Sequence, residues 1–263
     1  MGSQVAVKLV SRSQIARADG TPRPHERPSF YALAPGRWRD YVTLLHPPYT
    51  LWHLSYVVLG AALAPTLRYE RLGATLVAFF LAVGIAAHAL DEVEGRPLKT
   101  RVPDRVLYAL AALSLAGATA LGIVGAVLAS TWLVAFIAFG LFIAPAYNLG
   151  WFGGRFHSDF WFALAWGAFP FLTAYWASAE RFESAALVGA VGCFTLSLAQ
   201  RTLSRRVRTI RRQVHALEGT VIYTDGRTER ITKEQALVAD ERALMLMAVS
   251  VVAVSVAALL VRV

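Results

Sequence analysis

Long apolar stretches separated by short polar segments dominate the chain. The segment 106–154 contains no Asp, Glu, Lys or Arg. It is long enough for two membrane-spanning helices of about 20 residues each, and we place the break between them near 129–131. Further stretches of suitable length are found at 41–67, 72–90, 160–179, 184–200 and 243–261. The pattern predicts an all-α protein, a polytopic transmembrane bundle of about seven helices.

The polar segments predict how the chain is organised around this bundle. Residues 1–40 are rich in Arg, Pro and Ser and are predicted to be a cytoplasmic, largely disordered tail. The bundle proper is predicted at 41–200. In 201–242, an apolar stripe with helical spacing and a basic stripe on another face predict a helix, and Asp225-Gly226 predicts the turn of a hairpin. Thr232 with Gln235 predicts a capping box that starts the helix leading into the last span, 243–263.

The distribution of charge predicts the orientation in the membrane. Only 16% of residues are charged and 56% are hydrophobic, whereas a soluble domain carries about a quarter charged residues. Of the 26 Lys and Arg, 22 lie before residue 41 or in the segments 91–105, 148–159 and 201–242. Because Lys and Arg are retained on the cytoplasmic side, we expect a multi-pass cell-membrane protein with a cytoplasmic N-terminus and an external C-terminus. The net charge of +9 is thus mainly a topology signal, and no aromatic-studded basic domain suggests nucleic-acid binding.

The most informative polar segment is His88–Pro103, at the end of the second span. On a helix, His88, Asp91 and Glu92 would share a face and Glu94 would lie close to Asp91. Oxygen ligands of this kind suit Mg²⁺, which also binds phosphate oxygens of its substrates. Three cations that follow would reach the same phosphates: Arg96, Lys99 and Arg101. The alternative is a charged loop whose ions pair with one another or with water.

Two further polar clusters are expected on the same membrane face. The first follows Tyr147 and comprises Asn148, Arg155, His157, Ser158 and Asp159, of which Asp159 would join a metal or cap the next helix. The second lies at the end of the sixth span and comprises Gln200, Arg201, Ser204 and Arg205. His46 and His53, in the first span, are expected to be interfacial or packed. The convergence of three clusters on one face indicates a site for a lipid with a polar head group.

Three stretches of the chain resemble a known protein family. The stretches LLHPPYTLWHLSYVVLGAALA, HALDEVEGRPL and PAYNLGWFGGRFHSDFWFALAWGAFPFL resemble the UbiA superfamily of intramembrane prenyltransferases over roughly residues 41–200. The resemblance implies a helical bundle in which two Asp-rich motifs and Mg²⁺ ionise a prenyl diphosphate, and a lipophilic acceptor captures the cation. The chain departs from the pattern because Gly95 replaces the last Asp of the first motif, and SLAQRTLSRRVR, without a carboxylate, stands where the second should be.

The resemblance implies a role for each candidate residue. The expected metal ligands are Asp91 and Glu92, supported by Glu94, and the expected catalytic residues are Asp91 and Asp159. The expected substrate-binding residues are His88, Arg96, Lys99, Arg101, Asn148, Arg155, His157, Arg201 and Arg205. The expected function is Mg²⁺-dependent transfer of a prenyl group from a diphosphate to a lipophilic acceptor. The alternatives are a non-catalytic binder of isoprenoid or anionic lipid on the same scaffold, and a small transporter or membrane assembly subunit.

Overall fold

The computed structural model describes residues 27–262, and this part of the chain is mainly helical. Residues 27–262 form seven long helical segments and one short helix, and two of the long segments contain a π-helical stretch. The elements are α1 (Arg37–Leu44), α2 (Pro47–Leu63), α3 (Tyr69–Phe79), η3 (Phe80–Ala87), α4 (His88–Val93), α5 (Asp104–Leu128), α6 (Leu133–Asn148), α7 (Asp159–Ala163), η4 (Leu164–Ala168), α8 (Phe169–Ala179), α9 (Ser184–Gln213), β1 (Glu218–Ile222), β2 (Thr228–Thr232) and α10 (Lys233–Leu260).

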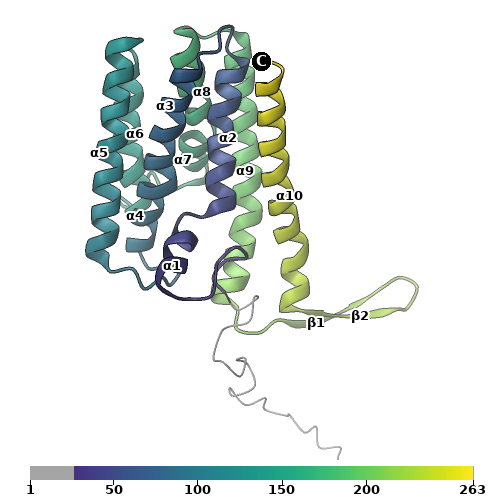
Figure 1. Ribbon diagram of the computed structural model, residues 1–263. Coiled ribbons are helices and arrows are strands. Elements are labelled where there is room, and N and C mark those ends of the chain that lie inside the picture. The colour runs from purple at the N-terminus through teal and green to yellow at the C-terminus, as the bar shows by residue number, and fades with distance from the viewer. Residues whose placement is uncertain (1–26, 263) are drawn as a thin grey trace, which may run out of the picture.

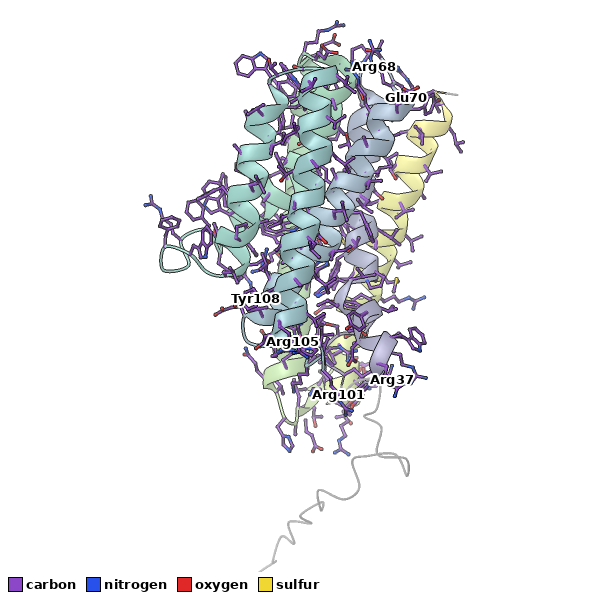
Figure 2. The ribbon with its side chains drawn as sticks, turned by 60° about the vertical axis from the view of Figure 1, so that its left-hand side comes forward. Arg37, Arg68, Glu70, Arg101, Arg105 and Tyr108 are labelled. Atoms are coloured by element: carbon purple, nitrogen blue, oxygen red, sulfur yellow. The ribbon has the colours of Figure 1, made fainter. Side chains whose placement is uncertain are left out.

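The long helices run side by side, and the two strands leave the bundle at one end (Figure 1). We call this end the hairpin end and the other the opposite end. Helix α2 packs against α8 and α10 in the middle of the bundle. Charged side chains gather at both ends, with Arg37, Arg101 and Arg105 at the hairpin end and Arg68 and Glu70 at the opposite end (Figure 2).

Four helices in the described part are long and apolar enough to cross a membrane: Tyr69–Val93, Asp104–Leu128, Ser184–Gln213 and Lys233–Leu260. Helix α6 is apolar but shorter. Large hydrophobic side chains such as Leu113, Val127 and Val188 are exposed on these helices. Apolar exposure of this extent is costly in water and suits a lipid environment.

The first predicted span is divided in the structure. The prediction had one helix over 41–67, but α1 ends at Leu44 and α2 begins at Pro47. His46 lies between them with φ 45°, in the left-handed region. Pro47 and Pro48 occupy the first turn of α2, where their missing N–H groups are not needed. The prolines therefore start a new helix, which directs His46 and His53 to the interior.

Close helix contacts depend on small residues at two places. A Cβ at Gly60 of α2 would overlap the backbone carbonyl of Phe171 in α8. A Cβ at Gly167 of η4 would lie 2.7 Å from the carbonyl oxygen of Cys193 in α9. These glycines allow α2, η4–α8 and α9 to approach closely and to form one wall of the cavity described below.

The predicted features after the sixth span are present. Helix α9 continues to Gln213, and β1 pairs with β2 in an antiparallel hairpin. Gly226 adopts φ 84° in the turn, and Thr232 and Gln235 form the predicted capping box at the start of α10.

Of the tail predicted at 1–40, the structure describes residues 27–40. Residues 1–26 lie outside the described part. Residues 27–36 pack on the bundle at the hairpin end, and we call them the strap. Arg211 Nη1 donates a hydrogen bond to the carbonyl of Arg27 (3.0 Å), and Arg212 Nε donates one to that of Pro28 (3.2 Å).

Candidate functional site

A polar cavity of about 220 Å³ lies at the hairpin end of the bundle. Helices α2, α4, α6, α7, η4 and α9 surround it together with the strap. Its walls are formed by Ser29, Phe30, Tyr31, His46, Tyr49, His53, Ala87, His88, Asp91, Tyr147, Asn148, His157, Phe162, Trp166, Gln200, Arg201, Ser204, Val207, Arg208 and Arg212. We call it the head-group cavity.

The charge of this cavity is mainly positive. Three arginines of α9, Arg201, Arg208 and Arg212, line it, whereas Asp91 is the single carboxylate among its described lining residues. Spacings of seven and four residues place the three arginines on one side of the helix. Three guanidinium groups opposite one carboxylate favour an anionic ligand.

Three buried polar atoms of the lining residues have no hydrogen-bond partner within residues 27–262: His46 Nε2, Tyr147 Oη and Gln200 Oε1. Their residues are 8%, 4% and 2% exposed. A buried polar group without a partner costs about 1–3 kcal/mol. These three atoms are therefore available for hydrogen bonds with a polar ligand or with ordered water.

Three of the cavity histidines are oriented by backbone carbonyls. The Nδ1 atoms of His53, His88 and His157 lie 2.7, 3.2 and 2.9 Å from the carbonyl oxygens of Trp166, Gly84 and Tyr147. A carbonyl oxygen only accepts, so each Nδ1 carries a hydrogen, and in the neutral ring the lone pair is on Nε2.

His46 has a different partner, the hydroxyl of Tyr31 in the strap. The Tyr31 oxygen lies 2.7 Å from His46 Nδ1, and the His46 ring stacks on that of His88 with centroids 4.1 Å apart. Burial raises the pKa of Tyr31 to about 12, so its hydroxyl keeps its proton at neutral pH.

Three aromatic side chains form one part of the cavity lining, which we call the aromatic wall. Tyr147 and Trp166 lie with their ring centroids 4.5 Å apart, and Phe162 stacks on Trp166 at 5.8 Å. The guanidinium carbon of Arg201 lies 5.2 Å from the centroid of Phe162. The cavity thus places a cation, an aromatic surface and hydrogen-bonding groups next to one another.

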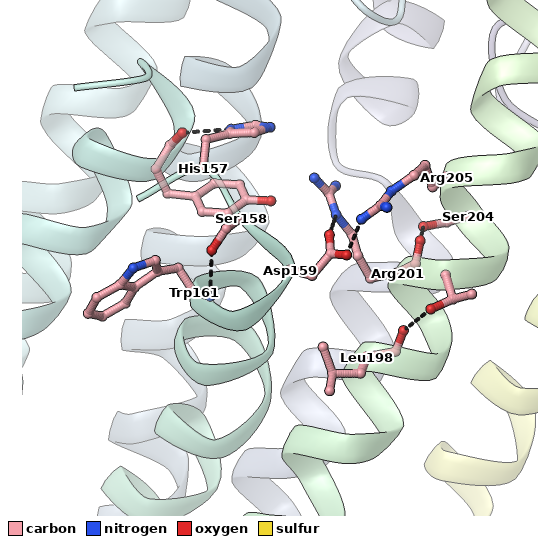
Figure 3. A network of polar contacts seen from close by, with 10 residues as sticks. His157, Ser158, Asp159, Trp161, Leu198, Arg201, Ser204 and Arg205 are labelled. Carbon is pink, nitrogen blue, oxygen red and sulfur yellow. Dashed lines mark hydrogen bonds and ion pairs between the residues drawn. The ribbon is translucent and has the colours of Figure 1, made fainter. Parts of the chain in front are cut away.

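Asp159, at the start of α7, lies beside the cavity and holds one of its arginines (Figure 3). Its carboxylate forms ion pairs with Arg205 and with Arg201, whose Nε is 3.3 Å from Oδ1. The hydrogen bond from Arg205 is the main reason that the pKa of Asp159 is lowered. Ser158 is the N-cap, accepting from the Trp161 N–H. Asp159 therefore orients Arg201 and does not line the cavity itself.

Gln200 and Ser204, from the polar cluster predicted at the end of the sixth span, line the cavity. Of the residues predicted to bind metal or substrate or to be catalytic, five line it: His88, Asp91, Asn148, His157 and Arg201. The others do not. Arg205 is paired with Asp159, Arg96 pairs with Asp104 and donates to the carbonyl of Val102, and Glu94, Lys99, Arg101 and Arg155 are exposed. Arg96 thus forms an ion pair with a neighbouring charged residue, which is the alternative interpretation of this charged segment.

Glu92 is fully buried and has a different function from that expected. Its carboxylate accepts hydrogen bonds from the N–H of Leu98 (2.9 Å), the N–H of Thr100 (2.8 Å) and the Thr100 hydroxyl (2.9 Å). It therefore stabilises the loop between α4 and α5. Within residues 27–262 no group of three or more His, Cys, Asp or Glu could hold a metal ion. Asp91, Glu92 and Glu94 therefore do not form the single ligand set that the sequence predicted, and Asp91 alone of the three lines the cavity.

Several lining residues were absent from the predicted site: Tyr31, His46, His53, Arg208 and Arg212. Arg208 and Arg212 follow Arg201 along α9 at helical spacing. This spacing alone indicates that the three arginines share one face of the helix. An ionisable residue inside a predicted span, such as His53, is by itself a candidate functional residue. Tyr31 gave no such signal because it lies in a segment of tail-like composition.

A second cavity, about 270 Å³, lies toward the opposite end between α3, α5, α6 and α8. Glu70 and Arg71 are the charged residues among its described lining, and most of the others are Ala, Gly, Leu, Val, Ile or Phe. Comparison with family models, with curated proteins and with solved structures gives no match for this chain.

Proposed function

We propose that the protein is an intramembrane prenyltransferase that binds a prenyl diphosphate in the head-group cavity and transfers its prenyl group to a lipophilic acceptor. The observation that carries the proposal is the partly buried row of Arg201, Arg208 and Arg212 next to the aromatic wall. In this arrangement the arginines bind the diphosphate and the hairpin end faces the cytoplasm, in agreement with the bias of Lys and Arg toward that side.

The arginines also have a chemical role in this proposal. When the bond between the prenyl carbon and the diphosphate oxygen breaks, negative charge grows on the diphosphate. Guanidinium groups already in position stabilise that charge. The faces of Tyr147, Phe162 and Trp166 favour a neighbouring cation. Because Asp91, Glu92 and Glu94 do not form one ligand set, we derive no step through a metal. Asp91 is the carboxylate among the described lining residues of the cavity.

Two apolar regions of the protein are available to bind the apolar tail of the substrate. The second cavity supplies an apolar volume inside the bundle, and large exposed hydrophobic side chains line the outer faces of α5, α6 and α9. Burial of each CH₂ group contributes about 0.8 kcal/mol. Much of the affinity for a long isoprenoid therefore comes from its tail.

A second candidate is a protein that binds an isoprenoid phosphate without cleaving it. The structural use of Glu92 and the single carboxylate in the cavity favour this candidate. The two candidates share the head-group cavity and differ only in turnover.

Binding and turnover of farnesyl diphosphate by the purified full chain in lipid nanodiscs test the proposal. We expect binding that inorganic diphosphate competes for. Arg208→Gln should weaken it about 10- to 100-fold, because a hydrogen bond to a charged group contributes about 1.5–3 kcal/mol. Arg206→Gln is the matched control, since Arg206 lies on the same helix, pairs with Asp240 and is not a lining residue.

The outcomes separate the candidates. Labelled lipid formed from radioactive farnesyl diphosphate and a membrane lipid extract supports transfer. Binding without release of diphosphate supports the second candidate. Absence of binding, or equal loss of binding in Arg206→Gln and Arg208→Gln, refutes both. Repeating the binding measurement in EDTA shows whether the arginines bind the diphosphate without a metal.

A further inference from the structure

His53 occupies a special position at the deep end of the head-group cavity. It lies seven residues beyond His46 along α2, which is about 10 Å further from the hairpin end. It is 3% exposed, and its ring centroid lies 6.0 Å from that of Phe162. Arg201 approaches the same Phe162 ring. His53 is thus next to the place where the diphosphate would meet the prenyl chain.

The sequence explains why the His53 ring is oriented as it is. In an α-helix the carbonyl of Trp166 would accept from the N–H of residue 170, but residue 170 is Pro and has no N–H. The carbonyl therefore has no N–H donor at the α-helical position, and His53 Nδ1 lies 2.7 Å from its oxygen. Trp166 lies within the π-helical segment η4, and such segments are frequent at functional sites.

This hydrogen bond determines the chemistry of the other nitrogen. With the hydrogen on Nδ1, His53 Nε2 has a free lone pair and can accept a proton. When it does so, the Nδ1–H bond to the Trp166 carbonyl becomes charge-assisted and stronger. A ring held in one tautomer by a second group is the usual arrangement of a general base.

We infer that His53 Nε2 accepts the proton of the acceptor during prenyl transfer, an inference that depends on the proposed function. The acceptor is a lipophilic molecule with a hydroxyl or phenol group. The bond from prenyl C1 to the diphosphate oxygen breaks, and its electron pair leaves with the diphosphate. The acceptor oxygen forms the new bond to C1, and its hydroxyl proton moves to His53 Nε2.

His53→Gln tests the inference in the full chain. General-base catalysis contributes about 10²–10⁴-fold. We therefore expect at least a 100-fold loss of lipid product from farnesyl diphosphate. Binding of a farnesyl thiodiphosphate analogue, which ionises slowly, should stay within threefold. Any remaining ionisation should give farnesol by capture of water. Transfer within threefold of the wild type would overturn the inference, as would an equal loss of analogue binding, which would make His53 a head-group ligand.

A second variant tests the orientation of the His53 ring without changing His53 itself. Pro170→Ala supplies an N–H that competes with His53 for the Trp166 carbonyl, so we expect a severalfold loss of transfer with unchanged analogue binding. The double variant with His53→Gln should be no slower than His53→Gln alone, because the proline acts through the histidine. Pro145→Ala in α6 is the matched control, since its new N–H meets Leu141, which does not line the head-group cavity.

These outcomes distinguish the inference from the proposed function. If the wild type neither binds nor turns over farnesyl diphosphate, the proposed function is wrong. If the wild type is active and the Pro170→Ala effect persists unchanged in the His53→Gln background, the function stands and the assignment of His53 is wrong.

Discussion

Glu92 provides the sharpest test of how the hairpin end is built. Its two carboxylate oxygens accept three hydrogen bonds from the loop between α4 and α5, and the side chain is fully buried. Glu92→Ala leaves the N–H groups of Leu98 and Thr100 without a partner. At about 1–3 kcal/mol for each buried N–H, the free energy of unfolding should fall by about 2–6 kcal/mol.

Glu92→Gln should have a smaller effect of the same sign. The amide keeps one acceptor oxygen but turns an NH₂ donor toward a backbone donor, so one of the two N–H groups loses its bond. We expect a loss of about 1–3 kcal/mol. Denaturant unfolding of the purified protein in detergent measures both variants, and hydrogen exchange over residues 94–103 should become faster.

Glu94→Gln is the control, because Glu94 is two residues away and exposed. Substitution at such a surface position should change stability by no more than about 0.5 kcal/mol. The reasoning is refuted if Glu92→Gln leaves stability and loop exchange unchanged but abolishes Mg²⁺-dependent turnover. That result would mark Glu92 as a metal ligand, as the sequence pattern predicted.

Three further predictions concern other parts of the fold. Gly60→Ala should strongly lower the melting temperature, because its Cβ would overlap the backbone of α8, whereas Gly73→Ala has free space and should be neutral or stabilising by up to about 1 kcal/mol in the same melts. Asp159→Asn should destabilise the protein at neutral pH. The pKa of Asp159 is lowered by Arg205 in the folded state, so the difference between wild type and variant should persist down to the ordinary value of 3.8 and disappear as the pH falls further through the folded-state pKa. Thr232→Ala removes the capping box and should cost about 1 kcal/mol, measurable as faster hydrogen exchange at the start of α10.

The helices were largely predictable because their apolar stretches are long and uninterrupted. The predicted spans at 72–90 and 184–200 lie within the helical segments Tyr69–Val93 and Ser184–Gln213. The division of the first span was missed, although Pro47-Pro48 marked it. Hydropathy reports which residues avoid water, and it does not show where a helix is interrupted inside an apolar stretch.

The site was harder to predict because neighbouring residues with the same chemistry point in different directions. Asp91 faces the cavity, whereas Glu92 turns to the backbone of the next loop. Likewise Arg201 lines the cavity, whereas Arg205, one turn later, is exposed and pairs with Asp159. Which carboxylate or guanidinium faces a ligand depends on the tertiary position of the loops, and helical spacing alone does not determine it.

The strap has a practical consequence for work on this protein. Because Ser29, Phe30 and Tyr31 form part of the cavity wall, a shortened chain that starts at Pro47 would have an open site, and affinities measured on it would describe a different pocket. The turn at Asp225-Gly226 is at the far tip of the hairpin (Figure 1) and makes no contact with that wall. A fluorescent or affinity tag therefore belongs in the hairpin turn, and the residues before the first long helix are best left intact.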